Sequence, residues 1–195
     1  MNYFSLALAA ALTMFAACNS SNNPASAQST DAPAAESTAM SETNSSPDYK
    51  YNPPADPENL NKIDKTDAEW KAELSDEAYR VLRQEGTQRA YSEPELLNNK
   101  KEGIYTCSAC GLPLFSSATK FESGTGWPSF YEPLNPLFVG ENEDTSYGMR
   151  RVEVHCARCD GHQGHVFPDG PEPTGLRYCI NAVSLDFVPE AEVKE

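Results

Sequence analysis

Two Cys-x-x-Cys pairs, Cys107 with Cys110 and Cys156 with Cys159, constrain the fold of this chain more than any other feature. A turn of this spacing can present two thiolates to one Zn²⁺ ion, and two such turns complete a tetrahedral site without an open position. A closed site of this kind is structural. The pattern therefore predicts a zinc clamp that joins loops of the domain.

Other roles for these cysteines remain open at this point. Disulfides form in exported proteins, which meet an oxidising compartment. One Cys-x-x-Cys could be redox-active, although the βαβ context typical of such motifs is absent. A site made of one pair with His162 and His165 is arithmetically possible, but it would leave Cys107 and Cys110 without partners. We therefore favour four sulfur ligands.

The first residues predict a targeting segment. Tyr3 to Ala17 is apolar and uncharged, and it is shorter than the ~20 residues that span a bilayer. It ends before Cys18 in small residues, which resembles a bacterial lipoprotein signal that would leave Cys18 as a lipid-carrying N-terminus. Phe15 and the lack of a preceding Lys or Arg depart from that pattern, so an ordinary signal is the alternative.

The segment after Cys18 is rich in Ser, Ala, Asn, Thr and Pro, and such a composition cannot bury enough apolar surface to fold. We expect four parts: residues 1–17 as a signal peptide, 18–58 as the lipidation site and a disordered linker, 59–190 as the folded domain and 191–195 as a tail. The protein is then exported, as a lipoprotein on the periplasmic face of a bacterial membrane or in the periplasm, and the lipid is its only membrane contact.

The formal net charge of −14 argues against nucleic-acid binding, which needs a basic face. A hydrophobic fraction of 39% is low for a globular chain, in agreement with a part that does not fold. The negative charge thus argues against polyanionic partners, including the nucleic acids that zinc-ribbon proteins bind. Separately, we expect the protein to be a monomer.

Local patterns predict a mostly β fold with short N-terminal helices. Thr66 and Glu69 have the spacing of a capping box, and Ser75 starts a second helix that is expected to stop at Gly86. Apolar runs then predict antiparallel strands, and residues 124–148 predict a long loop. We expect a small antiparallel β domain, tent-like or barrel-like, clamped by a four-cysteine zinc site, with strands in 103–106, 112–115, 149–155 and 176–188.

Cys179 is the candidate nucleophile. On a strand, Arg177, Cys179 and Asn181 share one face, and the charge of Arg177 favours the reactive thiolate. A buried structural cysteine is the alternative, although Arg and Asn are poor core neighbours. His162 and His165 lie upstream in what reads as a Gly-flanked loop, and they could fold back as a general acid/base pair.

Five stretches together resemble the B-type methionine-R-sulfoxide reductases, over roughly residues 67–188. They are the two Cys-x-x-Cys pairs, Gly126-Trp127-Pro128-Ser129-Phe130, Gly164-His165-Val166-Phe167-x-Asp169-Gly170-Pro171 and Arg177-Tyr178-Cys179-Ile180-Asn181.

The resemblance implies a β-rich fold with structural zinc on Cys107, Cys110, Cys156 and Cys159. It also implies that Cys179 attacks the sulfur of methionine sulfoxide, in proteins or free, and becomes a sulfenic acid. The remaining roles that it implies are proton donation by His165 and His162, support of the thiolate by Arg177, orientation by Asn181, a substrate-methyl contact by Trp127 and a lesser, orienting role for Asp169.

One position departs from the family pattern. Many members carry a second, resolving cysteine where this chain has Thr125. With Cys18 lipidated and four sulfurs on zinc, no thiol remains to resolve the sulfenic acid, so a thioredoxin-like or other external thiol must reduce it directly. The substrates would be oxidised exported proteins. A zinc-stabilised binding module that has lost catalysis is the rival interpretation.

Overall fold

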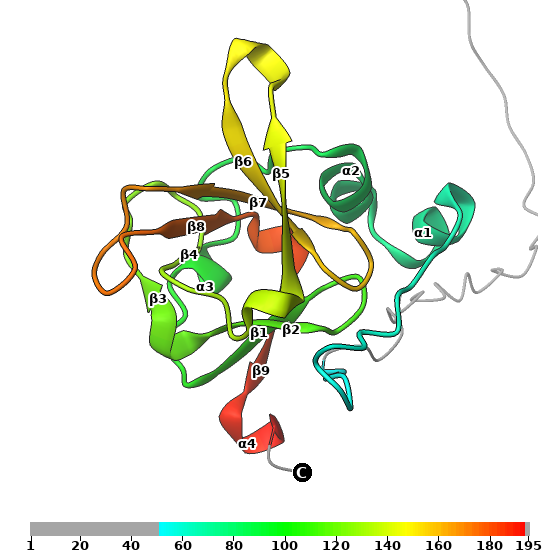
Figure 1. Cartoon of the computed structure of the whole chain (residues 1–195), viewed down its shortest axis with the longest axis horizontal. Coiled ribbons are helices and arrows are strands. Elements are labelled where there is room, and N and C mark those ends of the chain that lie inside the picture. The colour runs from blue at the N-terminus through cyan, green and yellow to red at the C-terminus, as the bar shows by residue number, and fades with distance from the viewer. Residues whose placement is uncertain (1–50, 194–195) are drawn as a thin grey trace, which may run out of the picture. The chain divides into compact units, whose positions relative to one another are not determined.

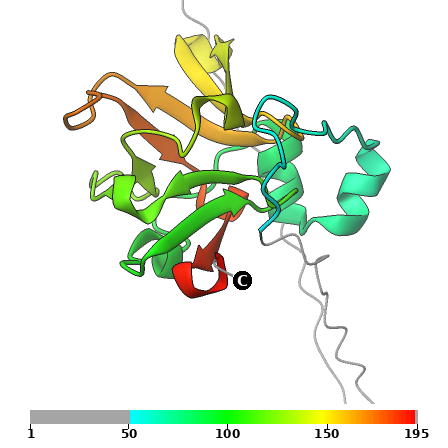
Figure 2. The same ribbon diagram turned by 60° about the horizontal axis from the view of Figure 1, so that its bottom comes forward.

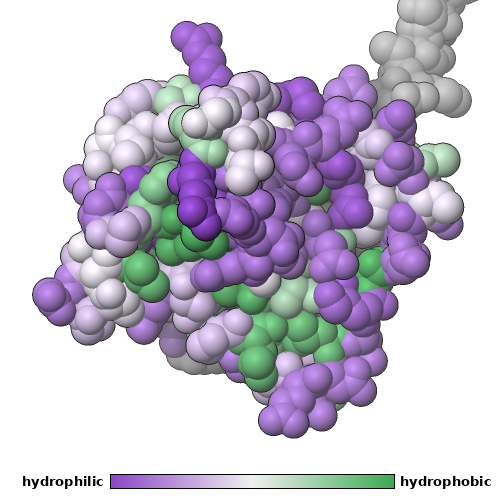
Figure 3. All heavy atoms as spheres, turned by 45° about the horizontal axis from the view of Figure 1, so that its top comes forward, coloured by the Kyte–Doolittle hydropathy of each residue, from purple (hydrophilic) through white to green (hydrophobic). Residues whose placement is uncertain are grey.

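The structure, a computed structural model, describes residues 51–193. The predicted signal peptide, Cys18 and most of the predicted linker lie outside these residues. No helix within 51–193 is long and apolar enough to cross a membrane. The surface seen from the β5–β6 end is largely hydrophilic, with apolar atoms gathered in patches, as suits an acidic chain (Figure 3).

Short strands dominate the described chain, as predicted. In chain order the helices and strands are α1 (Asp67–Glu73), α2 (Asp76–Gln84), α3 (Pro94–Leu97), β1 (Gly103–Cys107), β2 (Pro113–Ser116), β3 (Lys120–Phe121), β4 (Ser129–Phe130), β5 (Val139–Asp144), β6 (Arg151–Cys156), β7 (His162–Phe167), β8 (Arg177–Ile180), β9 (Leu185–Pro189) and α4 (Glu190–Val193).

The strands form two antiparallel sheets, which confirms the predicted mostly β class. One sheet has the order β2-β1-β9 and the other the order β3-β4-β8-β7-β6-β5. The β5–β6 hairpin projects from the body, and α1 and α2 lie to one side of the sheets (Figures 1 and 2).

An aromatic cluster joins the two sheets. Phe115 of β2 stacks on Phe130 of β4 with ring centroids 4.5 Å apart, and Tyr105 of β1 meets Phe130 edge-on at 5.0 Å. All three side chains are fully buried. Aromatic pairs in such geometries add about 0.5–1.5 kcal/mol beyond the burial of their surface. The core thus lies between the sheets and holds them in a fixed relation.

The two predicted helix starts are confirmed. Thr66 caps α1 in a capping box with Glu69, and Ser75 caps α2 through the amide of Ala78. The expected stop at Gly86 is one residue late, because Glu85 adopts the left-handed conformation (φ 54°) that ends the helix. The amide of Gly86 then bonds the carbonyl of Arg80.

Two segments differ from the prediction. The stretch 124–148, expected to be a loop, contains β4 and all of β5. The run 176–188, expected as one strand region, divides at a 3₁₀ turn (Ala182–Ser184) into β8 and β9, which belong to different sheets. The chain therefore crosses from the larger sheet to the smaller one directly after Cys179.

Residues 51–63 lie against the cysteine region. The amide of Asn52 donates to the carbonyl of Gly111, and the buried Arg158 guanidinium donates to the carbonyls of Asn52 and Leu60. Asn52 falls within the predicted linker, so contacts with the domain begin before residue 59.

Candidate active site and metal centre

A β-bulge places the two upstream histidines on one face of the larger sheet. His162 and His165 lie on strand β7, not in the loop that the sequence suggested. Residues three apart on a regular strand point to opposite faces. Here the pairing of β6 with β7 shifts between Val154 and His155, so β7 carries one extra residue at a β-bulge. The extra residue interrupts the alternation of side chains, and the two histidines therefore point to the same face. The imidazole centroids are 5.4 Å apart.

Cys179 lies on β8 between these histidines and β4. Its pairing partners are His165 on β7 and Ser129 on β4. A glycine permits the close approach of β7 to β8, because a Cβ on Gly164 would lie 2.0 Å from the carbonyl oxygen of Cys179. The candidate nucleophile and the candidate acid are therefore direct neighbours across the sheet.

Burial has the largest effect on the pKa of the Cys179 thiol. It raises the pKa of the thiol above its ordinary value, although a hydrogen bond from Thr125 and the charge of Arg177 act in the opposite direction. Arg177 does favour the thiolate as predicted, but it does not outweigh burial. Its guanidinium is held by two 2.9 Å bonds to Asp169 and lies over the ring of Phe167. Asp169 thus orients Arg177.

Cys179 opens onto a small cavity of about 120 Å³. The aromatic side chains of Trp127 and Phe167 form apolar walls, and His165 and Arg151 contribute polar groups. The other lining residues are Thr87, Gly164 and Asn181. A site with apolar walls and a few convergent polar groups is the usual form of a small-ligand pocket.

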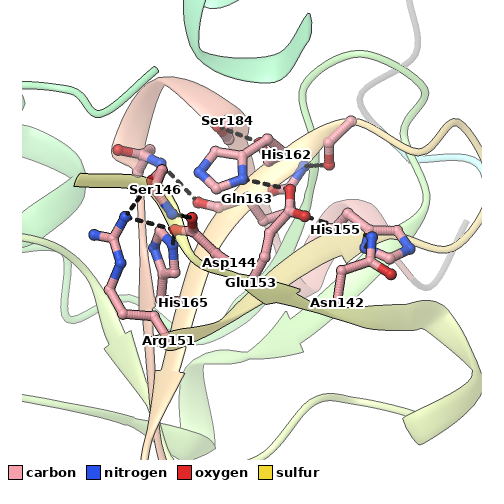
Figure 4. Close-up of polar contacts among 12 residues, drawn as sticks. Asn142, Asp144, Ser146, Arg151, Glu153, His155, His162, Gln163, His165 and Ser184 are labelled. Atoms are coloured by element: carbon pink, nitrogen blue, oxygen red, sulfur yellow. Dashed lines mark hydrogen bonds and ion pairs between the residues drawn. The ribbon is translucent and has the colours of Figure 1, made fainter. Parts of the chain in front are cut away.

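His165 is tied to the β5–β6 hairpin. Its Nε2 lies 2.7 Å from Oδ2 of Asp144, which also accepts a 2.5 Å bond from Nη2 of Arg151 (Figure 4). Hydrogen bonds from Ser146, His165 and Arg151 hold the pKa of Asp144 well below its usual range. Burial lowers the pKa of His165, and the bond to Asp144 raises it in part.

His162 lies beside His165 and is only 3% exposed. Its Nδ1 lies 2.7 Å from Oε1 of Glu153, and this bond lowers the pKa of the carboxyl (Figure 4). Its Nε2 is buried without a hydrogen-bond partner among the described residues. Each histidine therefore has a carboxylate of its own, and one ring nitrogen of His162 is unsatisfied.

Asn181 and Trp127 both form hydrogen bonds with the backbone of Gln88, which follows α2. The side-chain oxygen of Asn181 accepts from the amide of Gln88 at 2.9 Å, and its nitrogen donates to the carbonyl of Gln163 at 3.0 Å. The indole nitrogen of Trp127 donates to the carbonyl of Gln88 at 3.0 Å. Asn181 thus links β7 to residue 88, and the indole ring is fixed as a wall of the cavity.

The four remaining cysteines of the described chain form a buried cluster. Their Sγ atoms all lie within 4.8 Å of one another, and the short contacts join the two pairs: Cys107 to Cys159 at 3.7 Å and Cys110 to Cys156 at 3.6 Å. Zn–S bonds of about 2.3 Å in a tetrahedron place sulfur atoms about 3.8 Å apart. The cluster therefore could hold a metal ion, and its soft donors suit Zn²⁺.

The surroundings agree with this fit. Burial raises the pKa of Cys156 well above its usual range, so thiolates here need a cation close by. Gln163 donates to Sγ of Cys107 at 3.5 Å, and Nη1 of Arg158 donates to the carbonyl oxygen of Cys110 at 3.4 Å. His162 faces Glu153, so the alternative ligand set with histidines finds no support.

A family model described as the SelR domain matches residues 74–189, more than half of the chain. The chain belongs to the SelR family. This SelR chain is 61% identical over 126 residues to the peptide methionine sulfoxide reductase MsrB of Thiobacillus denitrificans, covering 65% of this chain and 95% of the relative. The MsrB proteins of Methanosarcina mazei (60% over 132 residues; 68% and 94% covered) and Pseudomonas putida W619 (57% over 130; 67% and 97%) are similar. The resemblance to B-type methionine-R-sulfoxide reductases is thereby confirmed.

Sequence reasoning missed several residues of the SelR site. Asp144, Glu153 and Arg151 reach the histidines from β5 and β6 through strand register, and no local motif marks them. Phe167 could have been predicted to line the site, because its apolar ring follows the candidate acid His165 within the Gly-His-Val-Phe stretch. Thr87 gave no signal.

Proposed function

We propose that Cys179 performs the methionine R-sulfoxide reduction that membership of this family assigns to the chain. The observation that carries the proposal is a half-buried thiol that lines a cavity together with Trp127, Phe167 and His165. A thiol, an adjacent imidazole and apolar walls are what an S-methyl sulfoxide side chain requires.

In this reaction the Cys179 thiolate attacks the sulfoxide sulfur while the sulfoxide oxygen accepts a proton. The attack forms a bond between the sulfur of Cys179 and the substrate sulfur, and the protonated oxygen leaves the substrate as hydroxide. The hydroxide then adds to the sulfur of Cys179 as the new S–S bond breaks, so that Cys179 becomes a sulfenic acid and methionine leaves as the sulfide. Cys179 gives up two electrons and the substrate sulfur gains them. The overall change, thiol plus sulfoxide to sulfenic acid plus sulfide, needs no further proton.

The proton can come from the thiol itself. Because burial raises the pKa of Cys179 and lowers that of His165, both groups are largely neutral at neutral pH. His165, opposite Cys179, would take the proton as the sulfur attacks and deliver it to the sulfoxide oxygen. His162 would hold the second imidazole position beside it, with Glu153 fixing its ring.

Preference for one epimer would come from the walls of the cavity. The indole of Trp127 is fixed through Gln88, and an S-methyl group that packs on it leaves the oxygen on the polar side, near His165 and Arg151. The opposite epimer would direct its oxygen at an apolar wall, where it loses hydrogen bonds at a cost of about 1–3 kcal/mol.

Recycling would use an outside thiol. A thiol of a thioredoxin-like or other reductant attacks the sulfenic acid, water leaves, and a second thiol releases Cys179 from the mixed disulfide. Within the described residues every other cysteine belongs to the buried cluster, in which we propose structural Zn²⁺. With Cys18 as lipid anchor, the enzyme would repair oxidised exported proteins at a membrane surface.

A single-turnover assay with each epimer of a blocked methionine sulfoxide tests this function. We expect one methionine per chain from the R epimer only, a Cys179 that a sulfenic-acid reagent traps, and no product with Cys179→Ser. Turnover by Cys179→Ser would refute the nucleophile, and failure of the zinc-loaded wild-type chain with both epimers would support the binding module instead.

A further inference from the structure

Three hydroxyl groups form a chain that ends on the sulfur of Cys179. Oγ of Ser129 lies 2.7 Å from Oγ of Ser123, Oγ of Ser123 lies 2.8 Å from Oγ1 of Thr125, and Oγ1 of Thr125 lies 3.8 Å from Sγ of Cys179. At the far end, Oγ of Ser129 donates to the carbonyl oxygen of Trp127 at 3.2 Å. The chain therefore runs from a reactive sulfur to a fixed acceptor.

Every hydroxyl has one proton to donate and can also accept, so the chain has two consistent directions. With a neutral thiol, the S–H donates to Thr125, Thr125 to Ser123, Ser123 to Ser129, and Ser129 to the Trp127 carbonyl. With a thiolate, each hydroxyl turns round: Ser129 donates to Ser123, Ser123 to Thr125, and Thr125 to the sulfur. Rotation of three C–O bonds is the only motion needed.

The backbone holds these groups in place. Ser129 is fully buried and is the pairing partner of Cys179 across β4 and β8. The amide of Thr125 points at Oγ of Ser123 at 3.4 Å, so Ser123 fixes the loop that carries Thr125. The donor is thus built into the sheet beside the nucleophile.

We propose that Thr125 is a further catalytic residue, whose hydroxyl stabilises the Cys179 thiolate through a hydrogen-bond chain that reverses direction when the sulfur ionises. The proposal rests on the proposed role of Cys179. It assigns to Ser123 a positioning role, because Ser123 acts on the sulfur only through Thr125. The hydroxyl of Ser129 holds Ser123 and also lowers the pKa of Cys179 itself, more weakly than Thr125 does.

The electrostatics of the site agree with this role. Among the effects that favour the thiolate, the hydrogen bond from Thr125 acts more strongly on the pKa of Cys179 than the charge of Arg177. The other charged or titratable groups near the sulfur are His165 on β7, Arg151 on β6, and Asp169, which binds Arg177. A substitution at Thr125 leaves all of these in place.

The test is the pH dependence of iodoacetamide alkylation of Cys179 in the zinc-loaded chain, with Thr125→Val compared with Thr125→Ser. Valine matches threonine in shape and lacks the hydroxyl, whereas serine keeps it. A hydrogen bond to a charged group contributes about 1.5 kcal/mol, so we expect Thr125→Val to be alkylated about tenfold more slowly at neutral pH, with the wild-type rate reached only at higher pH. Thr125→Ser should follow the wild type.

Ser123→Ala supplies a second measurement, with an expected effect in the same direction but smaller, because Thr125 keeps its own proton. Equal alkylation profiles for the valine variant and the wild type would overturn the proposal. Single-turnover reduction of the R-sulfoxide by the wild type is measured in parallel. If Cys179→Ser also turns over, the nucleophile assignment fails; if only the valine profile is unchanged, Thr125 alone loses its role.

Discussion

His165 on β7 and Asp144 at the end of β5 are joined by a 2.7 Å contact between Nε2 and Oδ2. The carboxylate is far along the chain from the imidazole and comes from the sheet edge. Since Arg151 shares the same oxygen, the imidazole is held in a fixed orientation beside Cys179. The β5–β6 hairpin, which projects from the domain, thus fixes the orientation of His165 and influences its pKa.

Asp144→Asn is expected to lower the pKa of His165 further, because the carboxylate opposes the effect of burial. His165 then becomes protonated only at a lower pH. The pH at which the reaction rate changes because of this protonation moves to a lower value as well. Imidazole NMR titration measures the pKa, and Glu153→Gln, which removes the carboxylate of His162 instead, is the matched control. A pKa of His165 that stays in place or rises would contradict this role.

His165→Asn should lower the single-turnover rate by about 10²–10⁴-fold, the usual contribution of a general acid or base. His155→Asn is the control, since His155 lies on β6 with its ring against Gly140 and Asn142, away from the cavity. Rapid-quench measurement of methionine released checks both. Comparable losses in the two variants would point to a fold defect.

Thr125→Cys is expected to form a disulfide with Cys179 after one turnover, because Oγ1 of Thr125 already lies 3.8 Å from the sulfur. Mass spectrometry of the oxidised chain distinguishes this product from the sulfenic acid of the wild type. Thr125→Ser serves as control. An intramolecular disulfide that joins Cys179 to another cysteine of the wild type would overturn the proposed recycling by an outside thiol.

Cys156→Ser should lose bound zinc and lower Tm by more than about 10 °C, because a metal site that cross-links the chain contributes directly to folding. Cys179→Ser should keep both its zinc and its Tm. Metal analysis and calorimetry check these outcomes. Full stability of the zinc-free wild type would argue against a structural metal.

Asn181→Ala is expected to reduce the free energy of unfolding by about 1–3 kcal/mol, since it leaves the buried amide of Gln88 without its acceptor. Asn181→Asp keeps that acceptor and loses only the donor to Gln163, so its loss should be smaller. Urea unfolding curves measure the difference. An alanine variant as stable as the wild type would mean that water replaces the side chain.

The sequence predicted those parts of the site that lie in local motifs. Both Cys-x-x-Cys pairs converge in one cluster, and Cys179 and Trp127 line one cavity. Helix starts were predictable because a capping box at Thr66 and a Ser cap at Ser75 act over a few residues.

Strand β7 could not be predicted, because a bulge interrupts its period-two pattern and Gly164 lowers its strand propensity. Strand β5 reads as Val-Gly-Glu-Asn-Glu-Asp, which lacks an apolar face because an edge strand buries little. The carboxylates of Asp144 and Glu153 depend on how these strands pair, so their partnership with the histidines was invisible without the register.

The two edges of the larger sheet bear on the proposed repair of oxidised proteins. At one edge, β3 is only two residues long, and at the other, β5 presents Glu141, Asn142 and Glu143 to solvent. Short or charged edges are poor templates for the addition of a foreign strand. An enzyme that repairs oxidised proteins, as we propose for this chain, can thus accept one side chain in its cavity without adding the rest of a partly unfolded substrate to its own sheet.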